Sequence, residues 1–467
     1  MHLMSAVAAR MPRTRRGTEL AMVIFALIIA LGAWTNVGLA LTGHVPASLT
    51  YYGAALTALA LIAHGLVRYY APYADPLLLP CVVLINGIGL VMIHRIDLAN
   101  TDNPRWDGQI LVGGQAPQQL LFTAVGIGLF AAVLIIIRDH RILARYTYTL
   151  GAAGLFFLAL PGMLPSSISE VNGAKLWIKL GPFSIQPAEF AKIALLVFFA
   201  GYLVNKREVL SMAGRRIFFI NLPRGRDLGP VLIAWVASLG VLVFEQDLGT
   251  SLLFFGLFVA MLYVATQRKS WLLIGGVLFV AGSLAASQIF AHVQNRINIW
   301  LHPFAGDNPT NEAFQLVQGL YGLAAGGLLG TGWGQGRPGM VPYAKTDFIM
   351  ASIGEELGLA GLMAMLLVYG IFVERGLRTG LSVRDPFGKM LAAGLSFVVA
   401  LQVFVVVGGV TRLIPLTGLT TPFLSYGGSS LVANWAILAL LLRISDAARR
   451  PPPQPIQDEG QTQVVTR

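Results

Sequence analysis

Residues 292–358 read HVQNRINIWLHPFAGDNPTNEAFQLVQGLYGLAAGGLLGTGWGQGRPGMVPYAKTDFIMASIGEELG and form the longest polar interruption in a mostly apolar chain. The stretch contains Arg296, Asp307, Asp347, Glu355 and Glu356 among many glycines. Hydrocarbon offers no partners to backbone N–H and C=O groups, so an irregular segment of this length must lie outside a bilayer or line a protein-walled cavity. We therefore expect the chemistry of this protein to be located here.

The composition of the rest of the chain is that of a membrane protein. The 467 residues are 55% hydrophobic and 12% charged, whereas about a quarter of the residues of soluble domains are charged. The net charge of +11 comes from basic residues scattered among short loops rather than gathered on one face, which argues against a nucleic-acid partner. Cys81 is the single cysteine, so no disulfide can form within the chain, and we expect it to face lipid or a neighbouring helix.

Apolar segments long enough to cross a bilayer recur along most of the sequence. A crossing needs about 20 mostly apolar residues. The pattern predicts an all-α polytopic membrane protein with about twelve transmembrane helices, a large extracytoplasmic loop and re-entrant segments. The predicted spans are 20–42, 48–67, 76–94, 118–137, 143–163, 186–204, 228–245, 249–267, 271–290, 347–373, 388–410 and 428–444. Residues 1–19 are predicted to be a basic cytoplasmic N-terminus and residues 447–467 a disordered cytoplasmic tail, since the tail lacks an apolar face.

Basic residues give the orientation of these spans. If both termini are cytoplasmic, the cytoplasmic side carries 24 of the 33 Lys and Arg residues and the other side carries 8, with Lys192 inside a span. This bias follows the positive-inside rule and predicts a multi-pass membrane protein with both termini cytoplasmic, in contact with membrane lipids. The predicted external segments are 95–117, 164–185, 291–346 and 411–427.

Several charged residues lie in or beside the predicted spans. Lys192 is about two turns into a span, where a charge normally faces a partner or a cavity. Glu189, three residues earlier, could neutralise it as a helix neighbour, so a snorkelling ion pair and a substrate contact both remain open. Asp247 lies in a tight external turn, where turn chemistry accounts for an Asp but not for a second carboxylate, Glu245.

The two ends of the predicted site region carry further polar features. Asp347 is expected at the start of a helix, where the positive end of the helix dipole stabilises its negative charge. Glu355 lies about 12 Å deeper, and acids inside a membrane are functional candidates. Residues 415–430, PLTGLTTPFLSYGGSS, contain two prolines and three glycines, which would break a continuous helix and predict a re-entrant or cavity-lining loop.

Other motifs exclude several classes of function. The glycine string at residues 330–336 follows no strand and opens no βαβ unit, so it is not a nucleotide-binding loop. The seven histidines have no metal-ligand spacing, and neither a Gly-x-Ser-x-Gly elbow nor a Walker motif is present. No cofactor is predicted, although the sequence leaves open a divalent cation.

The polar segments, taken together and in order, resemble one protein family. They are VNGAKLWIKLG with IQPAEFAK, QDLGTS, RINIWLHPFAGDNP with FQLVQGLYGLAAGGLLGTGWGQG, TDFIMASIGEELG, and IPLTGLTTPFLSYGGSS. This combination resembles the SEDS family (shape, elongation, division and sporulation proteins), the RodA and FtsW peptidoglycan glycosyltransferases, with a RodA-like member favoured. The resemblance implies a location in the bacterial cytoplasmic membrane. It also implies a ten-helix catalytic core over residues 76–446, preceded by two additional transmembrane helices over residues 20–75.

The resemblance also implies a reaction and a set of site residues. Members of the family polymerise lipid II: a glycan on undecaprenyl diphosphate is the donor, and a new lipid II supplies the acceptor hydroxyl. Asp307 matches the catalytic Asp of the family, although an Asp-Asn-Pro turn is an alternative role for it. Cations that could neutralise the diphosphate are Arg296, Lys175, Lys192, Lys345 and Arg412. The other predicted substrate-binding residues are Gln186, Asp247, Asp347, Glu355, Glu356 and Ser425.

A partner and an alternative function complete the predictions. By resemblance, the expected partner is a class B penicillin-binding protein, because this chain has no acyl-transfer motif that could crosslink glycan. Gly354, Gly358 and Gly361 would permit close packing, either with a single-span partner or within the bundle. The alternative function is a flippase for lipid-linked precursors or another polytopic transporter, since buried charges also suit a translocation path. A passive scaffold for cell-wall proteins is a third interpretation.

Overall fold

The computed structural model describes residues 14–102, 114–171, 174–181, 183–211, 215–217, 220–222, 233, 236–237, 240, 247–306 and 308–451. Within this part of the chain, eleven helices are long and apolar enough to cross a membrane, which confirms the predicted all-α polytopic class. The predicted span 228–245 lies mostly outside the described residues. The long helices are α1 (Arg16–Thr42), α2 (Ser48–Tyr70), α3 (Leu78–Asp102), α4 (Ala116–Ile136), α5 (Thr147–Met163), α7 (Pro187–Ser211), α9 (Leu248–Thr266), α10 (Lys269–Ile289), α13 (Ile349–Ser382), α14 (Pro386–Val410) and α15 (Gly428–Arg449).

Shorter elements connect the long helices. They are η1 (His140–Tyr146), α6 (Ser166–Ser169), α11 (Ala291–Leu301), η3 (Asn308–Thr310), α12 (Phe314–Gly326) and η4 (Pro338–Met340), with the strands β1 (Glu170–Val171), β2 (Ala174–Lys175), β3 (Ile178–Leu180), β4 (Phe183–Ile185), β5 (Arg215–Ile217) and β6 (Ile220–Leu222). The strands pair as three antiparallel hairpins, β1–β2, β3–β4 and β5–β6. The predicted external segment 291–346, which we expected to be irregular, therefore contains two helices, α11 and α12. Val293 on α11 and Leu316 and Val317 on α12 are buried, so each helix gains an apolar contact.

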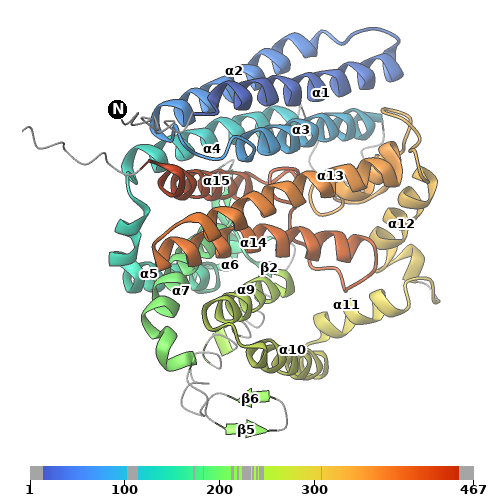
Figure 1. Ribbon diagram of the computed structural model, residues 1–467. Coiled ribbons are helices and arrows are strands. Elements are labelled where there is room, and N and C mark those ends of the chain that lie inside the picture. The colour runs from blue at the N-terminus through green and yellow to red at the C-terminus, as the bar shows by residue number, and fades with distance from the viewer. Residues whose placement is uncertain are drawn as a thin grey trace, which may run out of the picture.

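The long helices lie side by side in layers (Figure 1). Helices α1 and α2 form an outer layer against α3 and α4, while α15 and α13 occupy the middle and α10 lies at the far edge. Helix α15 is buried along most of its length, including Trp435 and Leu441, because it packs against α4, α13, α7 and α14. A helix that is apolar on nearly all sides is stable only in such a central position. Cys81 on α3 is also buried, facing neighbouring helices.

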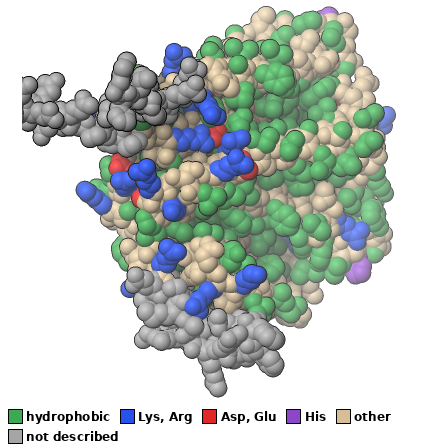
Figure 2. All heavy atoms as spheres, viewed as in Figure 1, with side chains coloured by type: hydrophobic (Ala, Val, Ile, Leu, Met, Phe, Trp, Pro, Cys, Tyr) green, Lys and Arg blue, Asp and Glu red, His purple; other side chains and the backbone are tan. Residues whose placement is uncertain are grey.

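One end of the bundle is fastened by ionic contacts between helix ends. Asp75, between α2 and α3, pairs with Arg449 of α15 and with Arg375 of α13. His140 of η1 lies 2.9 Å from Asp385, the residue before α14. Figure 2 shows Lys and Arg side chains gathered toward this end, where α1 begins, while hydrophobic side chains cover much of the remaining face. This distribution agrees with the charge bias read from the sequence.

Helix α13 is broken at Gly358. This residue has φ 67° and ψ −171°, so the predicted single span 347–373 is two helical pieces within Ile349–Ser382. The glycine-rich loop (residues 327–336) bonds to the opened backbone. Leu359 N donates to Gly327 O at 2.9 Å, and Thr331 N donates to Glu355 O at 3.0 Å. Backbone groups freed inside a membrane must be satisfied by protein, which explains why a glycine-rich segment lies here.

We expect Gly358→Ala to destabilise the protein. A Cβ there would lie 2.3 Å from Gly330 N, and φ +67° is costly for an L side chain; such backbone strain amounts to about 1–3 kcal/mol. Gly370→Ala in the same helix is the matched control, because a Cβ added there would have nothing within 4 Å and the φ of Gly370 is ordinary. The measurement is the apparent melting temperature in detergent. Equal melting temperatures for the two variants would contradict this account of the break.

Candidate active site

Arg296 and two carboxylates converge at the end of the bundle opposite the ionic cluster. Arg296 projects from α11, and its Nη1 donates to Leu416 O at 2.6 Å. Its charge acts on Asp247, at the start of α9, and on Asp347, just before α13, and in both cases favours the ionised carboxylate. Three segments that are distant in the sequence therefore bring one cation and two acids into one electrostatic site.

Asp247 caps helix α9. Its carboxylate accepts a hydrogen bond from Thr250 N at 2.9 Å and another from Thr250 Oγ1, and the residue is only 7% exposed. Burial raises the pKa of Asp247, against the lowering effects of Thr250 and Arg296. The predicted turn role is thus present, and the position next to Arg296 adds an electrostatic one.

Asp347 is held by hydrogen bonds with its neighbour Thr346 and with Gln315 on α12. Thr346 Oγ1 donates to Asp347 Oδ1 at 2.9 Å, and the side chain of Gln315 on α12 also bonds to it. Burial raises the pKa of Asp347, while these bonds and Arg296 lower it. Gln315 Nε2 also donates to Pro342 O at 3.1 Å, so α12 supports the segment that leads into α13.

Lys345 is buried and engaged with a carboxylate that the sequence-based prediction missed. Its Nζ lies 2.8 Å from Oδ1 of Asp97 on α3. The other oxygen of Asp97 accepts hydrogen bonds from Gln115 N and Ala116 N at the start of α4, at 2.9 and 2.8 Å. Lys345 therefore joins the segment before α13 to two further helices.

Residues 411–427, the external segment that contains most of the predicted re-entrant loop (415–430), are irregular and pack against the same segment. They are called the re-entrant loop below, and residues 428–430 of the predicted loop begin α15. Ser425 Oγ donates to Thr346 O at 2.5 Å and accepts from Thr421 N at 2.8 Å, while Tyr426 N donates to Lys345 O at 2.8 Å. Ser425 therefore links its own loop to the segment that contains Thr346 through hydrogen bonds. Burial raises the pKa of the Tyr426 phenol to about 12.

The Arg412 side chain donates hydrogen bonds to backbone carbonyls and does not extend into open space. Its Nε donates to Trp300 O at 2.9 Å and its Nη2 to Leu301 O at 3.1 Å, while Trp300 Nε1 donates to Arg412 O at 3.1 Å. A guanidinium at the carbonyl end of α11 satisfies free carbonyls and favours the helix dipole. Arg412 thereby fixes the helix that presents Arg296.

The two acids deepest in the predicted span, Glu355 and Glu356, accept hydrogen bonds from the glycine-rich loop and from the residue that follows it. Glu355 Oε1 accepts from Arg337 N at 2.7 Å, and Glu356 Oε2 accepts from Gly334 N at 3.0 Å. Glu356 is fully buried and pairs with Arg95 of α3, whose Nε lies 2.9 Å from Oε1. The structure therefore gives both acids contacts within the protein, and Arg95 is a second residue that the sequence-based prediction missed.

Lys192 is buried and paired across helices. Its Nζ lies 2.5 Å from Glu189 Oε2 and 3.1 Å from Oε1 of Gln402 on α14. Gln402 in turn donates to Thr420 O at 2.8 Å, so this pair reaches the re-entrant loop. Lys192 is 1% exposed, which excludes a snorkelling side chain. The pairing with Glu189 at i and i+3 was readable from the sequence, whereas Gln402 was not.

The remaining predicted residues lie apart from this cluster or outside the described chain. Gln186 N donates to Ser429 Oγ at 2.9 Å, which joins the start of α7 to α15. Lys175 is half-buried in β2, opposite Glu170. Asp307 lies outside the described residues. Among the residues described, no group of three or more His, Cys, Asp or Glu side chains could hold a metal ion.

An apolar cavity of about 460 Å³ adjoins the cluster. Its walls come from α9, α10, α11 and the re-entrant loop, and they include Leu252, Phe255, Phe279, Val293 and Ile414. Three other wall residues, Leu248, Ile297 and Thr417, are chain neighbours of Asp247, Arg296 and Leu416. A site for an apolar chain therefore adjoins the backbone that carries Arg296 and Asp247, although neither of these side chains lines it.

Comparisons with known proteins identify the family. The model of the FtsW/RodA/SpoVE family, described as cell cycle proteins, matches residues 76–450. The chain belongs to this family. Peptidoglycan glycosyltransferase RodA of Mycobacterium tuberculosis is 55% identical over 438 residues, covering 94% of this chain and 92% of that protein. Stage V sporulation protein E of Bacillus subtilis is 34% identical over 377 residues, covering 80% and 98%. The chain is thus a RodA-like SEDS protein and a multi-pass protein of the cytoplasmic membrane.

Solved structures agree with the family fold. A peptidoglycan synthase complex that coordinates polymerization and crosslinking contains a chain 27% identical to this one, with a TM-score of 0.61 over 81% of this chain and 99% of that chain. RodA of Thermus thermophilus is 24% identical with a TM-score of 0.54, covering 81% of this chain and 98% of that one, and shows the same fold. Both leave about a fifth of this chain unmatched.

Proposed function

We propose that this protein is a peptidoglycan glycosyltransferase that polymerises lipid II at the outer face of the cytoplasmic membrane. The observation that carries the proposal is the apolar cavity whose wall residues Leu248 and Ile297 are chain neighbours of Asp247 and Arg296. A polyprenyl diphosphate needs apolar walls for its chain and a cation at its head group. The cavity between α9, α10 and α11 offers the first, and Arg296 offers the second.

The reaction joins the anomeric carbon of the donor glycan to a hydroxyl oxygen of the acceptor lipid II. The bond from that carbon to the diphosphate breaks, the diphosphate leaves with the electron pair, and the hydroxyl proton passes to a base. In this proposal Asp307 is the base, and Arg296 neutralises charge on the departing diphosphate. The charge of Arg296 also favours the ionised carboxylates of Asp247 and Asp347 by lowering their pKa values.

The test is glycan synthesis by the purified protein supplied with lipid II, followed by separation of the products by length. The proposal expects strands of many disaccharide units and release of undecaprenyl diphosphate. A flippase would instead move labelled lipid II across a vesicle bilayer without making glycan. Transbilayer movement with no polymer formed would replace the proposed function by that alternative.

We also propose that both termini are cytoplasmic and that residues 164–185 and 291–346 face the outside. The bias of Lys and Arg toward one side supports this orientation. We expect single cysteines at Ser166 or Asn311, introduced into a Cys81→Ser parent, to react with a membrane-impermeant maleimide added outside intact cells. A cysteine at Arg207 serves as the opposite control. Labelling of the first two only after the membrane is opened would reverse the topology.

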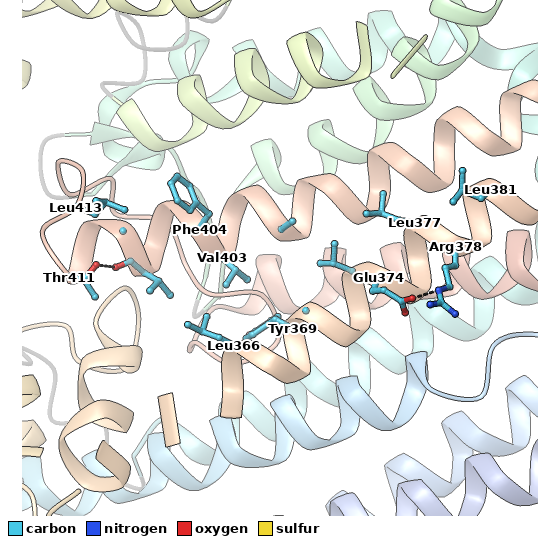
Figure 3. A pocket seen from close by; sticks show the side chains of 15 residues that line it. Leu366, Tyr369, Glu374, Leu377, Arg378, Leu381, Val403, Phe404, Thr411 and Leu413 are labelled. Carbon is cyan, nitrogen blue, oxygen red and sulfur yellow. Dashed lines mark hydrogen bonds and ion pairs between the residues drawn. The ribbon is translucent and has the colours of Figure 1, made fainter. Parts of the chain in front are cut away.

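The proposed partner is a crosslinking transpeptidase of the class B penicillin-binding type, anchored by a single transmembrane helix. A groove of about 630 Å³ between α13 and α14 could receive that helix (Figure 3). The groove extends from Leu381 at one end to Leu413 at the other, and its walls are mostly apolar. Phe404 is 54% exposed there, Ala400 has a small side chain and Gly370 has none. The resolved relative that belongs to a polymerization and crosslinking complex supports this choice of partner.

Filling the groove is expected to release the partner. We expect Ala400→Trp to lower the recovered transpeptidase by about tenfold, which corresponds to roughly 1.4 kcal/mol of binding free energy. Ala364→Trp, on an exposed face of α13 outside the groove, is the matched control. Co-purification in mild detergent measures the effect. Equal recovery with both variants would place the partner elsewhere.

Two of the three glycines that were predicted to permit close packing lie against other parts of this same chain. Gly354 lies against Leu323, and Gly358 lies against Gly330.

A further inference from the structure

The external end of α1 touches the glycine-rich loop. A Cβ on Gly334 would lie 2.9 Å from the Cβ of Ala40 and 3.5 Å from both Leu41 Cγ and Val37 O, all on α1. One turn earlier, the Trp34 ring stacks on His94 of α3, with ring centroids 4.2 Å apart and an interplanar angle of 10°. The first helix therefore ends against a segment that belongs to the family core, and it does so where that segment has no side chain.

Gly334 is held on its other side by a buried ion pair. Its N–H donates to Glu356 Oε2 at 3.0 Å, and its carbonyl accepts from Arg95 Nη2 at 3.1 Å. Arg95 Nη2 also donates to Gly336 O at 2.8 Å, while Arg95 Nε bonds to Glu356 Oε1 at 2.9 Å. One arginine thus fixes two carbonyls of the loop and one carboxylate of α13, a geometry that suits the planar guanidinium.

The held loop leads directly into the candidate site. Arg337 N donates to Glu355 at 2.7 Å, and the chain then continues through Lys345 to Asp347. Lys345 pairs with Asp97, two residues beyond Arg95 on α3. The end of α3 therefore contacts α1, the glycine-rich loop and the segment that carries Asp347.

We propose that α1 and Arg95 together position the glycine-rich loop for the reaction, so that the N-terminal helix α1 is a working part of the enzyme. The inference rests on the proposed function, since its readout is polymerisation. Arg95 acts through the loop and is a positioning residue. Misplacement of supporting groups by about 1 Å can cost on the order of 10²-fold in rate, so a contact this far from the reacting atoms can still matter.

A double-mutant cycle tests the contact with α1. Gly334→Ala is expected to lower kcat about tenfold or more, because the new methyl group meets Ala40 and because φ +78° is strained. Ala40→Gly alone should lower kcat by less than Gly334→Ala does, because it loosens the contact without adding a clash or backbone strain. The double variant should regain about threefold or more of the lost rate, since removing the Ala40 methyl relieves the clash but not the strain. Gly32→Ala, with nothing within 4 Å of its Cβ, is the matched control on α1.

A second pair of variants tests Arg95. Arg95→Lys keeps a charge for Glu356 but cannot bond two carbonyls and a carboxylate at once, so kcat per folded molecule should fall about tenfold with a smaller change in KM for lipid II. Arg16→Lys alters another buried arginine, paired with Glu19 on α1, and should lower the melting temperature without changing kcat per folded molecule. A merely structural Arg95 would behave as Arg16 does.

The outcomes separate this inference from the proposed function. If the wild-type protein makes no glycan from lipid II, the proposed function fails first. If the wild type is active and the double variant is no faster than Gly334→Ala, α1 does not position the loop. Wild-type kcat in the Arg95→Lys protein would remove Arg95 from the positioning role.

Discussion

Polymerisation by the Asp307→Asn protein is expected to fall by about 10²- to 10⁴-fold, the usual worth of general-base assistance. Asn keeps the shape and the turn hydrogen bonding of Asp but cannot accept the proton of the acceptor hydroxyl. Folding, membrane insertion and lipid II binding should survive the change. The measurement is the initial rate of glycan synthesis by purified protein, alongside the apparent melting temperature and lipid II binding.

A well-folded Asp307→Asn protein that makes glycan at a near-normal rate would reject this assignment. Asp307 would then have the turn role that an Asp-Asn-Pro sequence also suits. The base would have to be sought at Asp247 or Asp347, the two acids that face Arg296. Asp247→Asn and Asp347→Asn are therefore the matched variants for the same assay.

Arg296→Gln is expected to lower the rate by about 10²- to 10³-fold, as does the loss of one preorganised charge-stabilising group in other active sites. It should also move the acid limb of the pH profile to higher pH. Burial raises the pKa of Asp247 and Asp347, and the Arg296 charge opposes that rise. Without the cation both pKa values rise further, so the ionised carboxylates are lost at a higher pH as the medium is acidified.

Arg296→Lys separates charge from geometry in this experiment. Lysine keeps the charge that holds down the two pKa values but not the fork that bonds Leu416 O. Its acid limb should stay near that of wild type while the rate is intermediate. A Gln variant with an unshifted acid limb would show that neither carboxylate needs to be ionised, and a Gln variant with a normal rate would remove Arg296 from the reaction.

The partners of some charged side chains could be predicted from the sequence, and those of others could not. The ion pair of Lys192 with Glu189 was readable because helix neighbours at i and i+3 meet whatever surrounds them. The partners of Lys345 and Glu356 were not readable, since Asp97 and Arg95 lie on α3, about 250 residues away in the chain. The sequence shows only that Arg95 and Asp97 are charged residues near the end of an otherwise apolar span. It does not show which helix or loop packs against them.

The sequence by itself determined the class of protein, its membrane-spanning helices and its family. Those features depend on local composition, on the period and length of apolar runs, and on motifs that survive in order. Only the tertiary structure decided that Glu355 and Glu356 serve the glycine-rich loop and its neighbour, that Gly358 opens α13, and that α1 ends on Gly334. These facts depend on which helices pack together, because a charge or a backbone group removed from water must find its partner in whatever element lies beside it.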